Sequence, residues 1–267
     1  MFIFQLIISF LVGGIFIALQ TLIGERVSLR WRGIILTIPS TIAIGLFFIG
    51  LTKTPADAAQ AALFTPASEG ASYFFITIFA LLSGTRLIFN YGLSLIVWAL
   101  FACLIILFPP STFLNSFLFF ALPPVVIGYF IVKKMPQVST LKKFPININH
   151  VFFRSLLGGS IVAISVFLSK TLGNIWGGIF ATFPAVFSST LIIYFHLQGK
   201  KIIPSVVKSM FFPGALSFPV YGFVAMLTFP IYGIWIGTVL AYLAYLAFVL
   251  TWNFGKKILL KRNSGNL

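Results

Sequence analysis

The sequence has very few residues of the kinds that carry most enzyme chemistry. Three acids, Glu25, Asp57 and Glu69, stand among 267 residues, and 8% of the chain is charged, against about 25% in ordinary soluble domains. A single cysteine, Cys103, excludes an internal disulfide, and two histidines far apart in the sequence form no cluster with metal-ligand spacing. General acid–base and nucleophilic catalysis need such groups close together. We therefore expect no enzyme, no metal site and no cofactor.

The chain is instead rich in apolar and aromatic side chains. Hydrophobic residues make up 60% of it and aromatic residues 17%, and the mean hydropathy is +1.09. Because a helix of about 20 apolar residues crosses the hydrocarbon of a membrane, we expect the lipid bilayer as partner and an all-α, polytopic membrane helix bundle as the fold. Uncharged runs predict nine transmembrane helices, over residues 2–23, 33–51, 71–89, 91–108, 112–132, 151–169, 173–195, 209–229 and 231–253.

Basic residues outnumber acidic ones by 18 to 3, which gives a formal charge of +15. Such a charge on a soluble protein would suggest nucleic-acid binding. In this chain we expect no nucleic-acid partner, because short cytoplasmic loops of membrane proteins collect Lys and Arg. Alternating the loops about nine spans puts 16 of the 18 on one side and leaves Lys53 and Lys170 on the other. This predicts a multi-pass protein of the cell membrane, with the N-terminus outside and the C-terminus in the cytoplasm.

The two halves of the sequence match each other at an offset of 145 positions. The offset aligns Gly13, Gly14, Ala18, Trp31, Gly33, Ile34, Thr37 and Pro39 with Gly158, Gly159, Ala163, Trp176, Gly178, Ile179, Thr182 and Pro184. The match predicts a four-helix unit over residues 1–109, a linker helix with a basic cytoplasmic loop over 110–149, and a second four-helix unit with a basic tail over 150–267. Four crossings return the chain to the side of the membrane on which it began, and the linker helix then carries it to the other side. The second unit therefore begins on the opposite side from the first, which makes the two units a 4+1+4 inverted repeat. The paired glycines are expected to permit close helix packing.

The second helix of each unit carries a proline with hydroxyl side chains near it. Proline removes a backbone donor and frees a carbonyl in the preceding turn, and in lipid that carbonyl needs a partner. Matched helix breaks in two halves of a transporter point to its binding site. The candidate substrate-binding residues are Thr37, Pro39, Ser40, Thr41, Thr182, Pro184, Ser188 and Ser189. The alternative is a pair of structural kinks whose Ser and Thr side chains bond to their own helices.

The three acids fall outside the nine predicted spans. Glu25 is expected at a cytoplasmic helix end, and Asp57 and Glu69 in an external loop. An intramembrane carboxylate is a common proton relay and the natural partner of a cationic substrate. This placement therefore argues against a proton-coupled exporter of cations.

One stretch of the second unit resembles a known group of membrane proteins. It runs from Trp176-Gly177-Gly178-Ile179 through Thr182-Phe183-Pro184 to Tyr194 and Gly199, followed by Lys208-Ser209-Met210 and Tyr221. These residues are similar to the GlpM-like small four-helix bacterial membrane proteins and to related families of unknown function. The first unit resembles them more weakly, through Gly33, Ile34, Pro39 and the Gly13-Gly14 pair. The resemblance implies a four-helix membrane fold, duplicated here, and no settled chemistry.

Two functions fit these observations. The first is a transporter or channel for a small neutral or anionic solute, with its site at the membrane midplane between the two proline-containing helices. It predicts a cavity there, lined by hydroxyls and aromatic rings. The second is a structural or accessory membrane protein without transport activity, which predicts a filled core. The sequence leaves a homo-oligomer open in either case.

The topology can be tested with reporter fusions. A reporter at residue 1 should be outside the cell, and reporters within residues 133–150 and 256–267 should be in the cytoplasm, because positive loops stay inside. Termini that report the same side would contradict the nine-span count and the inverted repeat with it.

Overall fold

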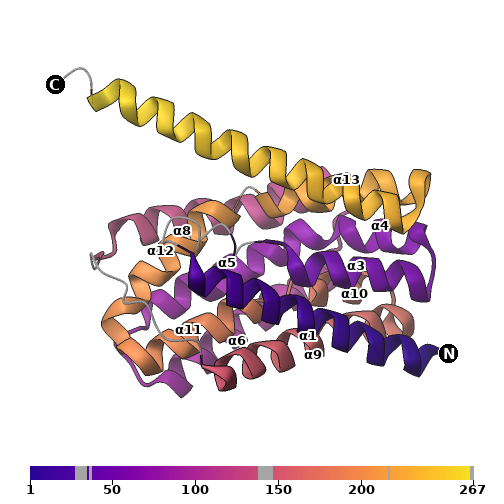
Figure 1. The fold of residues 1–267 in the computed structure, drawn as a ribbon, viewed down its shortest axis with the longest axis horizontal. Helices are drawn as coiled ribbons and strands as arrows, with labels where there is room; N and C mark the ends of the chain where they lie inside the picture. The colour runs from indigo at the N-terminus through magenta and orange to yellow at the C-terminus, as the bar shows by residue number, and fades with distance from the viewer. Residues whose placement is uncertain (28–34, 36–37, 138–146, 216, 265–267) are drawn as a thin grey trace.

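A computed structural model describes the chain except residues 28–34, 36–37, 138–146, 216 and 265–267. Over the described residues the fold is all-α, a layered bundle from which the C-terminal part of its longest helix projects (Figure 1). The helices are α1 (Phe2–Arg26), α3 (Ser40–Thr52), α4 (Pro55–Leu63), α5 (Thr65–Leu81), α6 (Leu87–Leu107), α7 (Phe113–Asn115), a π-helical turn (Ser116–Ala121), α8 (Leu122–Lys134), α9 (Ile148–Leu172), α10 (Asn174–Ala181), α11 (Ala185–Gln198), a 3-10 turn (Lys200–Ile202), α12 (Ile203–Gly214) and α13 (Ser217–Ser264).

The described residues hold six stretches that are long and apolar enough to cross a membrane. These are Phe2–Gly24, Leu87–Leu107, Phe113–Lys134, Ile148–Leu172, Asn174–Gln198 and Phe218–Thr251. Their outer faces are apolar: Ile88 on α6 is 88% exposed and Ile3 on α1 is 73% exposed. Lipid accommodates such a surface, whereas water does not. The chain is therefore helical and of membrane type.

The helix α13 folds back on itself at Gly233. This glycine has φ +74° and ψ 174°, a conformation that side-chain-bearing residues rarely adopt. The rings of Tyr221 and Tyr242, on either side of the break, lie 5.1 Å apart, and Gly237 packs against Phe229. Contacts that converge on Gly233 from both directions mean that the two halves of α13 run antiparallel. The break lies three residues beyond the boundary at residue 230 that the sequence predicted between spans 209–229 and 231–253.

The predicted close packing at the glycine pairs is confirmed, and the two helices that carry them, α1 and α9, pack against each other. A Cβ on Gly14 would lie 3.0 Å from the Ser155 carbonyl oxygen, and one on Gly159 would lie 2.5 Å from the Phe10 carbonyl oxygen. The 145-position offset relates the two contacts with the partners exchanged: it aligns Gly14 with Gly159, and Phe10 with Ser155. Gly13 against Val162 and Gly158 against Ile17 repeat this exchange. Phe2 stacks on Phe167, Phe10 lies against Gly159, and Gly14 lies against Ser155. Because the α9 number falls along this series, the two helices run antiparallel, and they lie side by side in Figure 1.

Two predicted placements are wrong, those of Glu69 and Arg154. The second span was expected over residues 33–51 with Pro39 inside it; α3 begins at Ser40, directly after Pro39, and residues 33–34 and 36–37 lie outside the described part of the chain. The third span was expected from residue 71, but α5 begins at Thr65 with Pro66 in its first turn, a position that suits proline. Glu69 is therefore in a helix and not in a loop. Arg154, counted with the cytoplasmic loop, lies inside α9 and is 3% exposed.

The α1–α9 contact gives a stability prediction. Changing Gly159→Ala pushes a methyl group into the α1 backbone, and such overpacking costs about 1–3 kcal/mol. The midpoint of thermal unfolding in detergent should fall by several degrees. The matched control is Gly92→Ala on α6, where an added Cβ meets nothing within 4 Å; its midpoint should stay close to wild type. Equal midpoints for the two variants would contradict close packing at this contact.

Candidate functional site

The two prolines predicted to interrupt helices do so with the same backbone geometry. Pro39 has φ −74° and ψ 61°, and Pro184 has φ −74° and ψ 49°. In each case the next residue donates its backbone N–H across the proline, from Ser40 to the Ile38 carbonyl and from Ala185 to the Phe183 carbonyl, both at 2.7 Å. These are inverse γ-turns. The helices α3 and α11 start directly after them.

The carbonyls released by the breaks find partners on neighbouring helices. Ser68 and Ser72 on α5 donate to the Ile179 and Thr182 carbonyls, both at 2.8 Å. At the other break, the Gln20 amide on α1 donates to the Ile35 carbonyl at 2.7 Å. An unsatisfied backbone group costs several kcal/mol in lipid. Both breaks are thus supported by side chains from helices outside the broken segment.

The two breaks meet at one small cavity. Its volume is about 30 Å³, enough for a water molecule or two. The lining comes from the start of α3, the α10–α11 break, α5 and the first half of α13, and consists of Ile38, Pro39, Ser40, Thr41, Ile42, Glu69, Thr182, Phe183, Pro184, Val186, Phe187 and Phe218. Hydroxyls, aromatic rings and one carboxyl therefore face a common space inside the bundle.

Five of the eight candidate residues from the sequence line this cavity: Pro39, Ser40, Thr41, Thr182 and Pro184. Thr37 lies outside the described residues. Ser188 and Ser189 are buried on α11 beyond the lining, and the Ser189 hydroxyl donates to the Val186 carbonyl at 3.1 Å. The cavity thus collects the residues next to each proline and leaves out those a turn further along α11. Whether they bind a substrate stays a prediction.

Glu69 is the lining residue that the sequence analysis missed. Its side chain comes from the second turn of α5 and is 5% exposed. Among the described residues its carboxyl has no hydrogen-bond or ion-pair partner. The expectation that every acid lies outside the helices was wrong because the charge was taken to mark a loop. Thr65-Pro66, a typical helix start, was the local signal that Glu69 belongs to a helix.

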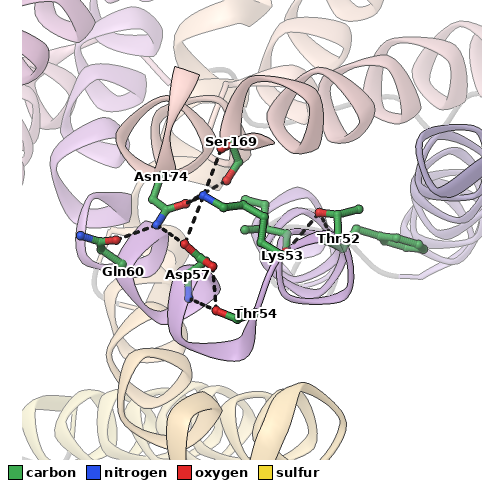
Figure 2. Close-up of polar contacts among 9 residues, drawn as sticks. Thr52, Lys53, Thr54, Asp57, Gln60, Ser169 and Asn174 are labelled. Carbon is green, nitrogen blue, oxygen red and sulfur yellow. Dashed lines mark hydrogen bonds and ion pairs between the residues drawn. The ribbon is translucent and has the colours of Figure 1, made fainter. Parts of the chain in front are cut away.

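A polar network ties the α3–α4 turn to the α9–α10 turn (Figure 2). The Lys53 ammonium lies 3.1 Å from the Asp57 carboxylate and also donates to the Asn174 side-chain oxygen. The Asn174 amide donates to Asp57 at 2.8 Å and to Gln60 at 2.6 Å. Thr54 caps α4 by accepting the Asp57 backbone N–H at 3.1 Å. The network joins residues more than 110 positions apart, and no sequence pattern indicated it.

The network changes the acidity of Asp57. Partial burial of the carboxyl acts to raise its pKa, but hydrogen bonds from Asn174, Thr54 and Lys53 outweigh burial and lower the pKa from 3.8 to about 2. Asp57 therefore remains a carboxylate throughout the physiological pH range.

Comparison with known proteins finds one family that is similar in sequence to the second half of the chain. A family model described as a protein of unknown function (DUF3147) matches residues 151–255. The matched stretch runs from the start of α9 into α13, which is close to the second four-helix unit predicted over 150–267. No curated protein and no solved structure matches the chain. The chain is thus similar over this stretch to an uncharacterised family, which carries no activity over to it.

The pKa of Asp57 gives a pH prediction. Because the folded value lies below the unfolded value of about 3.9, the ionised carboxylate stabilises the fold above that pH, and this stabilisation disappears as pH falls to about 2. Asp57→Asn should lower stability by about 1 kcal/mol at neutral pH. Thermal unfolding in a nonionic detergent should show a constant difference from wild type above about pH 5 and a shrinking one between about pH 4 and 2. A difference that does not change over this range would contradict the ionised network.

Proposed function

We propose that the protein is a membrane transporter or channel for a small neutral or anionic solute, with its site at the cavity between α3 and α11. The observation that carries the proposal is that two helices broken at matched prolines open onto one cavity. Discontinuous helices of this kind form substrate sites near the midplane of many transporters. The unpartnered Ser40 hydroxyl, which is buried in the lining, offers a hydrogen bond that the protein does not use itself.

The proposal includes a nine-span, 4+1+4 inverted repeat with the N-terminus outside. The exchange of partners between α1 and α9 supports it, because a twofold relation requires that if one residue contacts a second, their equivalents contact each other in reverse. The fold-back of α13 at Gly233 supports two crossings within Ser217–Ser264. The family match over 151–255 supports a second unit that corresponds to a module of its own.

A structural or accessory role is the alternative, and it predicts a filled core at the breaks. The cavity and its unused polar groups favour transport over this alternative. The described residues contain no group of three or more His, Cys, Asp or Glu that would hold a metal ion. That the protein is not an enzyme stays a part of the proposal.

Ligand-dependent stabilisation and flux test the proposal. Purified protein is screened by thermal shift against neutral and anionic metabolites, and compounds that stabilise it are followed as radiolabelled solutes into proteoliposomes. Ser40→Ala and Thr41→Val remove cavity hydroxyls, so uptake should fall about three- to tenfold for each, the effect of losing one hydrogen bond.

The matched control is Thr171→Val, an exposed threonine on α9 whose hydroxyl bonds to its own helix at the Phe167 carbonyl. It should leave uptake unchanged. If no compound in the panel stabilised the protein and none was transported, the transport proposal would be contradicted. Equal losses of uptake in the control and in the cavity variants would also contradict it.

A further inference from the structure

We propose that Glu69 carries a proton through the transport cycle and that the solute bound beside it is a small monovalent anion, so that the two cross the membrane together. This deepens the proposed function and rests on it. The cavity combines two features that no sequence motif predicted: the N-termini of α3 and α11, and the carboxyl of Glu69.

The two N-termini form the anion-binding part of the cavity. The first N–H groups of a helix have no acceptor within it, and neither α3 nor α11 has a side-chain cap. Thr41 and Ile42 of α3, with Val186 and Phe187 of α11, carry such groups and line the cavity. Each N-terminus acts as roughly +0.5 of an elementary charge and attracts anions. Together they suit about one negative charge.

Buried, unpartnered side chains in the same cavity give an independent indication of a ligand. Glu69 is 5% exposed, and Ser40, with a hydroxyl that lacks a partner, is 1% exposed. Among the described lining residues Glu69 is the one charged side chain, and none is Lys, Arg or His. In the proposed cycle Glu69 releases its proton before the empty cavity returns, and its carboxylate then supplies the negative charge that the N-termini suit.

An entering anion competes with the Glu69 carboxylate for the same positive ends. Two negative charges in a small buried cavity repel each other strongly. When Glu69 takes up a proton, the anion can replace its charge, and the neutral carboxyl can donate a hydrogen bond to it. The cavity then holds one negative charge whether it is empty or loaded. One proton and one anion move per cycle, and the transport is electroneutral.

Other titratable groups near α5 do not replace Glu69 in this role. Tyr73, one turn along α5, and Tyr245 on α13 interact electrostatically in this region, and phenols keep their protons at neutral pH. The remaining titratable groups with described side chains on the elements around α5 lie outside the lining: Asp57 on α4, Tyr91 and Cys103 on α6, Tyr129, Lys133 and Lys134 on α8, Tyr194 and His196 on α11, Lys208 on α12, and Tyr221, Tyr232 and Tyr242 on α13.

The wild-type protein can be tested in proteoliposomes with a pH-sensitive dye inside. The probes are chloride, nitrate and methanesulfonate, whose acids are too strong to cross lipid in neutral form. An inward gradient of a transported anion should acidify the lumen. The rate should fall at least tenfold as the pH on both sides rises from 5.5 to 8. A potential imposed with potassium and valinomycin should leave the rate unchanged. A rate that rises with pH, or that follows the potential, would overturn the proposal.

Glu69→Gln keeps the shape of the protonated side chain and cannot release a proton. It should still carry the anion, without luminal acidification, and the flux should now follow the membrane potential. Glu69→Asp should restore proton movement. Proton movement that persists in Glu69→Gln would overturn the proposal. Where this variant does not fold, the pH and potential dependence of the wild type decide the question.

The outcomes separate this inference from the proposed function. Wild-type flux of a neutral solute, together with no flux of the three anions, would overturn the inference and leave transport standing. No flux of any solute would overturn both.

Discussion

The close backbone contact between α1 and α9 sets how the two halves of the chain meet. At Gly14 and Gly159 the glycine of one helix lies against a carbonyl of the other, so no side chain keeps the axes apart. Between membrane helices, packing of this kind is the main source of attraction, because lipid is as apolar as the side chains. Since α3 follows α1, and α10 and α11 follow α9, the antiparallel pair brings Pro39 and Pro184 to one cavity.

The breaks at these prolines divide the polar groups nearby into two kinds. Gln20, Ser68 and Ser72 bond to carbonyls near the breaks and so serve the backbone. The Ser40 hydroxyl and the Glu69 carboxyl line the cavity without a partner among the described residues. A structural kink needs only the side chains that bond to the free carbonyls, because it is stable once its backbone groups have hydrogen-bond partners. The second kind is the part of the cavity that we propose to bind a solute.

Residues that occur at equivalent positions in both halves of the sequence predicted the close helix packing and the two helix breaks. Residues that occur in one half alone, such as Glu69, gave no such prediction. The glycine pairs and the prolines occur twice at the same offset, so their contact and the matched breaks could be expected. Membrane helices such as α1, α6 and α9 followed from uncharged runs, because their hydrophobic lengths match the bilayer. The place of Glu69 in the cavity could not be predicted, because Thr182 and Phe187, which line the cavity with it, lie more than 110 positions away. The Lys53–Asn174 contact joins residues equally far apart.

The network of Lys53, Asp57 and Asn174 has a consequence for the two ends of the bundle. Under the 145-position offset Asn174 corresponds to Leu29, whose side chain cannot form hydrogen bonds. The offset that aligns Pro55 with Pro204 sets Asp57 against Val206, which has no charge. The network at the α3–α4 turn therefore has no equivalent at the aligned positions, because Leu29 and Val206 lack the polar side chains that form it. In the proposed inverted repeat, the two units would therefore match in their glycines and prolines and differ in the side chains at these aligned positions.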